Sequence, residues 1–198
     1  MMKIGKITML AAALVAVAGC FDQPEPAYKS VQEGQRVYLK ELGLADLKGQ
    51  TFAEAVDYLN LDRNALTNVD EVTALVNLKW LRLNDNRLSE LPDLSKLVNL
   101  RRIYLRGNRF TEVPETLKDL PALTDVDLSG NPVAEIPDWL AKKEGLVALS
   151  FTATKVTKLP DDLSAWKSLK QLQLGELNLT TNEMARVREA LRGAEVVF

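Results

Sequence analysis

One apolar sequence motif recurs along the chain at a nearly constant spacing, and this repetition constrains the fold more than any other feature. Its clearest copy, LKWLRLNDNRLSELP over residues 78–92, has leucines at Leu78, Leu81, Leu83 and Leu88 and an asparagine at Asn86. The spacing is 22 residues for the first three steps and 23 for the last three. Self-similarity at such a period indicates a solenoid of stacked units. The copies begin at Gly34, Val56, Leu78, Leu100, Leu123, Leu146 and Leu169.

The shared pattern is L-x-x-L-x-L-x-x-N-x-L, and on these residues the chain resembles the leucine-rich repeat family. The resemblance implies an α/β solenoid, a horseshoe of about seven coils including atypical caps, with a parallel β-sheet on its concave face. Each L-x-L segment predicts a short strand whose leucines point inward, because alternate strand residues point to opposite faces. One coil cannot bury its apolar face alone, whereas a stack of coils can.

The repeats divide residues 34–198 into a capped array. Residues 34–55 lack the asparagine and predict an N-terminal cap, residues 56–168 hold five repeats, and residues 169–198 form a C-terminal cap. Thr180 and Glu183 have the spacing of a capping box, which predicts a helix over about residues 181–192. Residues 195–198 predict a final edge strand. Apolar pairs three residues apart, such as Leu94 with Leu97, predict short helical turns on the convex side.

An asparagine stands where each central coil leaves its strand. Its amide can pair with backbone groups that the turn leaves unsatisfied, each of which costs about 1–3 kcal/mol when buried and unpaired. Thr154 and Leu177 take this place in the last two copies, so the sixth coil is expected to be looser. The predicted ladder consists of Asn64, Asn86, Asn108 and Asn131.

The first 33 residues predict a targeting segment followed by a tether. Lys3 and Lys6 precede an apolar stretch that is shorter than the about 20 residues a membrane span needs. Residues 17–20, VAGC, resemble the bacterial lipobox, which implies a lipoprotein signal peptide over residues 1–19, cleavage before Cys20 and lipidation of Cys20. An ordinary signal peptide with an incidental cysteine is the alternative. Residues 20–33 contain two prolines and predict a flexible tether.

This resemblance implies a bacterial lipoprotein in the cell envelope, held at a membrane by its N-terminal lipid anchor. Asp22 does not directly follow Cys20, which favours the outer membrane over the inner membrane. The repeat domain would then lie on the periplasmic side or at the cell surface.

Composition excludes several kinds of chemistry. The chain has no histidine and one cysteine, so it can form neither an intramolecular disulfide nor a Cys/His metal site. Its formal net charge of −2 does not favour nucleic acid as a partner. Asp125 and Asp127 form a carboxylate pair, but an open sheet offers no enclosed pocket that would separate their roles. The sequence therefore predicts no enzyme, no cofactor and no metal site.

The residues between the leucines are the candidates for function, because they face outward from the predicted sheet. In the first four coils they are mainly arginine, tyrosine and tryptophan, the residue types that dominate binding hot spots. The hypothesis is an unidentified protein partner with an acidic, extended or loop-like surface, centred on Trp80, Arg102 and Tyr104. The candidate binding residues are Arg36, Tyr38, Tyr58, Trp80, Arg82, Arg102, Tyr104, Arg106, Asp125 and Asp127.

Three alternatives stay open. Arg102 beside Asp125, and Tyr104 beside Asp127, could be cross-strand pairs that only hold the sheet. The exposed aromatics could instead stack on sugar rings of peptidoglycan or another cell-wall glycan. A structural envelope protein without a specific ligand is the third alternative.

Overall fold

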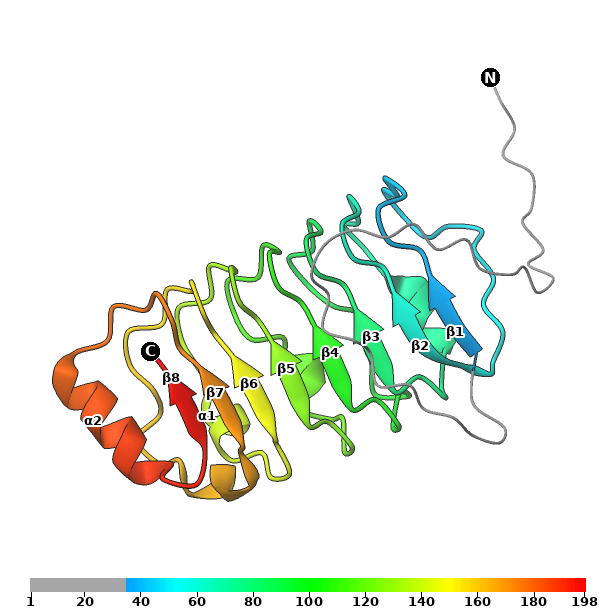
Figure 1. Ribbon diagram of the computed structural model, residues 1–198. Coiled ribbons are helices and arrows are strands. Elements are labelled where there is room, and N and C mark those ends of the chain that lie inside the picture. The colour runs from blue at the N-terminus through cyan, green and yellow to red at the C-terminus, as the bar shows by residue number, and fades with distance from the viewer. Residues whose placement is uncertain (1–34) are drawn as a thin grey trace, which may run out of the picture.

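The computed structural model describes residues 35–198, so the predicted signal peptide, Cys20 and the tether lie outside the described residues. The chain forms a leucine-rich repeat solenoid with one open, eight-stranded parallel sheet whose strands follow one another in sequence order (Figure 1). This confirms the predicted fold class. The strands are β1 (Gln35–Tyr38), β2 (Val56–Asn60), β3 (Trp80–Arg82), β4 (Arg102–Tyr104), β5 (Asp125–Asp127), β6 (Ala148–Ser150), β7 (Gln171–Gln173) and β8 (Glu195–Val197).

From Arg36 onward the sheet keeps one register, because the repeat supplies an equivalent residue at each step; the pairing shifts only between Gln35 and Arg36 at the first strand. Leu59 pairs with Leu81, Leu81 with Ile103, and the same column continues to the last strand. Central residues of this column, from Leu59 to Leu172, are at most 2% exposed. Burial of each such side chain contributes about 1.5–3 kcal/mol. The core is thus one continuous stripe behind the sheet.

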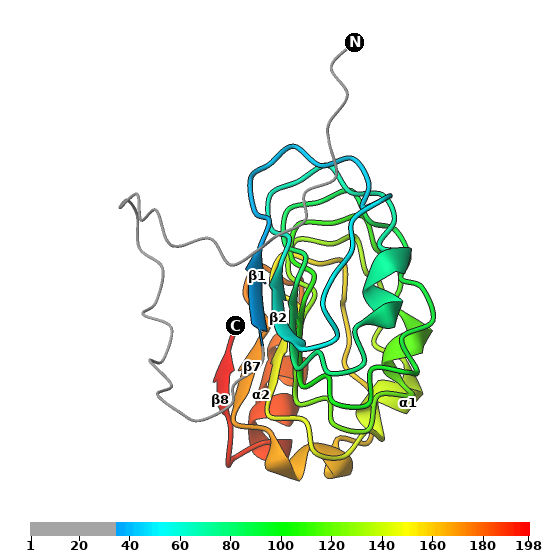
Figure 2. The ribbon, with the colours of Figure 1, turned by 90° about the vertical axis from the view of Figure 1, so that its right-hand side faces the viewer.

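Short helices lie on the side of several coils opposite the sheet, as Figure 2 shows along the stack. In the third coil, where residues 94–97 predicted a helical turn, the structure has a single hydrogen-bonded turn in which the Leu97 N–H donates to the Leu94 carbonyl at 2.8 Å. In residues 35–198 no helix has the length and apolarity to cross a membrane. The helices are η1 (Asp70–Ala74), η2 (Glu115–Leu117), α1 (Asp138–Ala141), η3 (Ser164–Ser168) and α2 (Thr181–Ala190).

Four asparagines tie neighbouring coils together at the exits of the strands. The Asn108 amide donates to the carbonyls of Leu83 and Leu105 at 2.9 Å each, and its oxygen accepts from the Leu88 N–H at 3.0 Å. Asn64, Asn86 and Asn131 make the equivalent bonds in the second, third and fifth coils. Asn108 is 7% exposed, so these bonds satisfy buried backbone groups.

The ladder ends at the sixth coil. There the Thr154 hydroxyl donates to the Phe151 carbonyl at 2.8 Å, a bond within its own coil. A threonine side chain is too short to donate to one coil and accept from the next as the asparagine amide does.

Helix α2 and strand β8 close the C-terminal end of the solenoid (Figure 1). Half of the predicted capping box forms, because Thr180 Oγ1 accepts from the Glu183 N–H at 3.2 Å. The other half is replaced: the Glu183 carboxylate accepts from the Leu159 N–H at 2.8 Å and from Arg186. Arg186 in turn donates to the carbonyls of residues 159–161. Glu183 thus fastens α2 to the preceding coil instead of to its own cap.

Candidate functional site

The outward residues of the strands form two columns that we call the sheet face. Strand pairing places Arg36, Tyr58, Trp80, Arg102 and Asp125 in one column, with Ala148 and Gln171 after them. Nine of the ten candidate binding residues therefore lie on one surface, and Arg106 follows two residues after β4. The second column consists of Tyr38, Asn60, Arg82, Tyr104, Asp127, Ser150 and Gln173.

Four aromatic rings run across the first four strands and make one aromatic stack of Tyr38, Tyr58, Trp80 and Tyr104. The ring centroids are 5.2 Å apart for Tyr38 and Tyr58, and 5.1 Å for Tyr58 and Trp80. Trp80 and Tyr104 follow at 5.9 Å. Such tilted and edge-to-face pairs contribute about 0.5–1.5 kcal/mol each beyond the buried area. The stack is therefore a ridge of rings that support one another across the four strands.

Three guanidinium groups lie over rings of this stack. The Arg102 Cζ lies 4.8 Å from the Trp80 ring centroid, and the Arg36 and Arg82 groups lie 5.7 and 5.9 Å from Tyr58 and Tyr104. Cation–π contacts of this kind stabilise by about 0.5–1 kcal/mol at exposed sites. Three of the four rings therefore carry a guanidinium group.

Exposure separates surface residues from supporting ones. Tyr38 is 49% exposed, and Trp80 and Tyr104 are half-buried. Tyr58 was expected to be an exposed binding residue, but it is only 3% exposed because it lies between Tyr38 and Trp80 and under Arg36. Its role is to hold its neighbours in place. The buried Trp80 Nε1 has no hydrogen-bond partner in the described structure.

An acidic residue outside the predicted set fixes Arg82. Asp62 accepts from Arg82 Nε at 2.7 Å through Oδ2 and from the Asn84 N–H at 2.7 Å through Oδ1. Burial raises the pKa of Asp62, against the opposing effect of the Arg82 charge. The sequence could have indicated this contact through the position of Asp62. It stands two residues after β2, in the outward column next to that of Arg82.

The two aspartates of β5 differ in their bonding. Asp125 faces Arg102, with Arg102 Nε and Asp125 Oδ1 3.6 Å apart, so the predicted cross-strand pair forms. Asp127 lies beside Tyr104 in register, but its Oδ1 accepts from the Ser129 N–H and hydroxyl at 2.9 and 2.6 Å. The cross-strand interpretation therefore applies to the first pair only.

Over β4–β7 the sheet face contains an open depression of about 270 Å³, which we call the C-terminal recess. Its floor is formed by Val126 and Leu149, and small residues on β6 leave it open. The outward residues that line it are Tyr104, Asp125, Asp127, Ala148, Ser150, Gln171 and Gln173.

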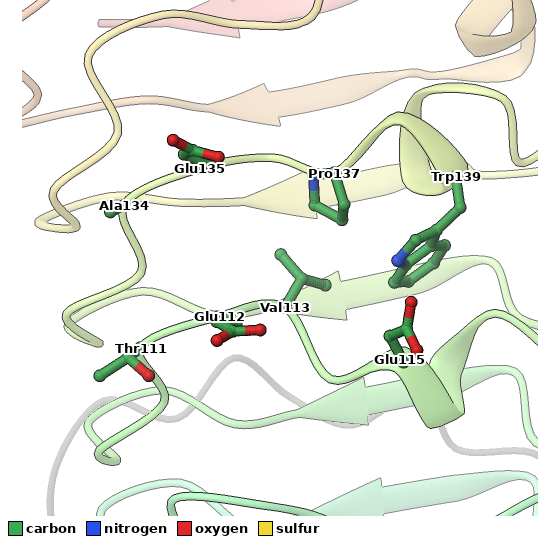
Figure 3. A pocket seen from close by; sticks show the side chains of 8 residues that line it. All are labelled: Thr111, Glu112, Val113, Glu115, Ala134, Glu135, Pro137 and Trp139. Carbon is green, nitrogen blue, oxygen red and sulfur yellow. The ribbon is translucent and has the colours of Figure 1, made fainter.

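A second cavity, of about 380 Å³, lies between the fourth and fifth coils, away from the sheet face (Figure 3). Trp139 and Pro137 wall it, and the Glu115 side chain points toward the indole ring. Trp139 resembles Trp80 in being half-buried with a buried indole nitrogen that lacks a partner in the described structure. In residues 35–198, no three His, Cys, Asp or Glu side chains are grouped so as to hold a metal ion.

Comparison with known proteins agrees with the fold. A sequence profile described as leucine rich repeat matches residues 76–133. A crystal structure of an internalin from Listeria monocytogenes is similar with a TM-score of 0.64 and 20% identity, over 83% of this chain and 45% of that one. The leucine-rich repeat domain of a Shigella effector gives a TM-score of 0.58 and 19% identity, over 82% and 80%. A search of curated protein sequences gave no significant match.

The chain thus spans less than half the length of the internalin structure. At these identities the likeness describes the fold alone.

Proposed function

We propose that the chain is a protein-binding module that holds its partner on the first four strands of the sheet face. Leucine-rich repeat proteins generally mediate protein–protein interaction, and the described solenoid leaves this face open. The observation that carries the proposal is the aromatic stack with guanidinium groups over three of its rings. Trp80, Arg102 and Tyr104 form its centre.

Preorganisation favours this surface. A binding site loses about 0.5–1.5 kcal/mol for each flexible side chain that it must immobilise. Arg82 is already held by Asp62 and lies over Tyr104, and Arg102 lies over Trp80 and near Asp125. A partner that presents a carboxylate or a backbone carbonyl meets guanidinium groups whose conformational entropy is already lost.

The same geometry disfavours a glycan as the ligand. Sugar stacking needs an accessible ring face, but Arg102 covers Trp80, and Tyr58 is buried. Of the four rings, only Tyr38 is exposed. A protein partner can use ring edges and guanidinium groups together, as hot spots do.

We further propose that the module works at the bacterial cell envelope, anchored through lipidated Cys20. The support is the lipobox-like VAGC of residues 17–20 and the polar, proline-containing tether over residues 20–33. More than one acyl chain gives stable membrane attachment, whereas one chain gives marginal attachment. We propose the outer membrane over the inner membrane, because Asp22 does not directly follow Cys20.

Site-specific photo-crosslinking in cells tests the binding proposal. A photo-reactive residue at position 106 leaves Trp80 and Arg102 intact, and Arg106 is an exposed neighbour of the stack. Lys118, exposed beside η2, provides the matched control position. We expect a discrete protein adduct from position 106 but not from position 118. Equal adducts from both positions, or none from position 106, would reject the sheet face as the binding surface.

The glycan alternative has its own measurement. Co-sedimentation of the full chain with purified cell wall should be absent. Sedimentation that disappears in the Trp80→Ala variant would replace the protein partner with a glycan.

A further inference from the structure

We propose that the C-terminal recess receives an arginine side chain of the partner. This inference rests on the proposed binding of a protein to the sheet face and adds a second, chemically different contact to it. The first four strands offer rings and guanidinium groups, whereas the recess offers carboxylates beside a single ring.

Side-chain size creates the recess. In register, Ala148 takes the column place of Arg102, and Ser150 takes that of Tyr104, two strands further along. The surface therefore drops between β4 and β7. Its volume of about 270 Å³ lies below the about 300–1,000 Å³ of sites that enclose whole small molecules, so one inserted side chain suits it better.

The charge of the recess is negative. Two of its lining residues are acidic and none is basic. Asp127 directs one oxygen, Oδ1, to both of its hydrogen bonds with Ser129. Asp125 Oδ1 lies 3.6 Å from Arg102 Nε, and Asp125 Oδ2 accepts a hydrogen bond from the Thr124 hydroxyl. Burial raises the pKa of the neighbouring Tyr104 phenol, and the charge of Asp125 adds to this rise while the charges of Arg102 and Arg82 oppose it.

Arginine matches this wall better than lysine does. Its planar guanidinium forks onto a carboxylate and stacks on an aromatic ring, while the lysine ammonium is a compact point charge. Tyr104 lies in register between Arg82 and Asp127, and already carries the Arg82 guanidinium 5.9 Å from its ring centroid. An arginine from the partner would repeat this contact on the side of Asp127.

Strand spacing predicts where the arginine lies in the partner. Neighbouring strands are about 4.8 Å apart, and an extended chain advances about 3.3 Å per residue. From Trp80 on β3 to the recess over β6 there are three strand steps, or about 14 Å. A segment that crosses the strands would therefore carry its arginine about four residues from the residue that contacts Trp80.

Selection of random peptides displayed on phage, against the full chain, tests the recess with a defined probe. We expect the enriched peptides to share an arginine. In synthetic copies, replacing this arginine with neutral citrulline should weaken binding about tenfold. Asp127→Asn should weaken the arginine peptide similarly and remove its advantage over the citrulline peptide, whereas Asp119→Asn, at an exposed carboxylate beside η2, should leave both unchanged.

Ala148→Arg provides an independent variant. It places the chain's own guanidinium in the recess at a column position that carries arginine on β4, so the fold should tolerate it. We expect it to weaken the arginine peptide more than the citrulline peptide, because both lose the space in the recess and only arginine also meets a like charge.

The outcomes separate the two proposals. Peptides that lose binding in Trp80→Ala but share no arginine, or bind equally well with citrulline, overturn the recess and leave the proposed function standing. Peptides that bind Trp80→Ala as well as the unaltered chain, or a selection without enrichment, count against both.

Discussion

The two halves of the sheet share a backbone and differ in almost everything outward of it. Strands β1–β4 carry the aromatic stack and its guanidinium groups, and the exits of β2–β5 are tied by the asparagine ladder. Strands β6 and β7 carry alanine, serine and glutamine, and Thr154 makes its bond within its own coil. The C-terminal end is held instead by the contacts of Glu183 and Arg186 from α2.

This difference shows which positions carry stability and which carry recognition. The inward leucines are equivalent in both halves, so they cannot account for the difference between the two halves. The outward positions are released from packing the core, and their size and charge alone turn one half into a ridge and the other into a recess. The following variants break or sharpen this contrast, from the largest expected effect to the smallest.

The ladder should give the largest difference between the halves. Asn108→Ala leaves buried backbone groups of two coils without partners, so we expect a loss of about 3 kcal/mol in the free energy of unfolding. Thr154→Ala removes a single bond and should cost about 1 kcal/mol. Urea unfolding measures both values, and equal losses would show that the ladder does not distinguish the halves.

Removal of a ring from the aromatic stack should have the next largest effect on stability. Trp80→Ala removes two ring contacts and the Arg102 cation–π contact, for an expected loss of about 2 kcal/mol in the free energy of unfolding. Urea unfolding of Trp80→Ala beside Tyr38→Ala, which removes one terminal ring, checks the value. A smaller loss for Trp80 than for Tyr38 would contradict a continuous stack.

The C-terminal end should respond to pH. Hydrogen bonding to Arg186 lowers the pKa of Glu183, so its stabilisation is present above the ordinary glutamate range and is lost as the pH falls through the lowered pKa. Glu183→Gln should therefore cost about 1 kcal/mol at neutral pH, with the difference from the unaltered chain vanishing in acid. Unfolding followed from neutral to acidic pH measures this.

Glu189 provides the control for that experiment. It pairs with Arg192 at the same spacing on the same helix, but both side chains are exposed. Glu189→Gln should leave stability unchanged at every pH. A pH-independent loss for Glu183→Gln would mean that its packing matters and its charge does not.

Substitutions at the positive-φ residues that precede the ladder positions should have the smallest effects on stability. The residue before each ladder position has a positive φ, which is 65° at Gly130 and 54° at Ala153. Glycine adopts this region without steric cost, so Ala153→Gly should raise the unfolding free energy by about 0.5 kcal/mol. Gly130→Ala should lower it by about 1 kcal/mol. Thermal unfolding detects both shifts, and shifts of the same sign would contradict the backbone argument.

The sequence predicts the register of the sheet but not the side-chain contacts between neighbouring strands. The period places Trp80 beside Tyr58 and Arg102, because equivalent residues of stacked coils must be neighbours. It does not show that Tyr58 is covered, that Asp62 holds Arg82, or that Glu183 bonds to Leu159. Those outcomes depend on side-chain directions and on contacts about 20 or more residues apart, which no local pattern encodes.

The dissociation constant of the captured partner tests the central claim most directly. Trp80→Ala and Trp139→Ala remove tryptophans of similar burial from different surfaces, and circular dichroism verifies that both variants are folded. If the sheet face is the binding surface, Trp80→Ala should weaken binding by about 2 kcal/mol or more, which is roughly thirtyfold, and Trp139→Ala should leave it unchanged. Equal losses, or a loss in Trp139→Ala alone, would contradict the account.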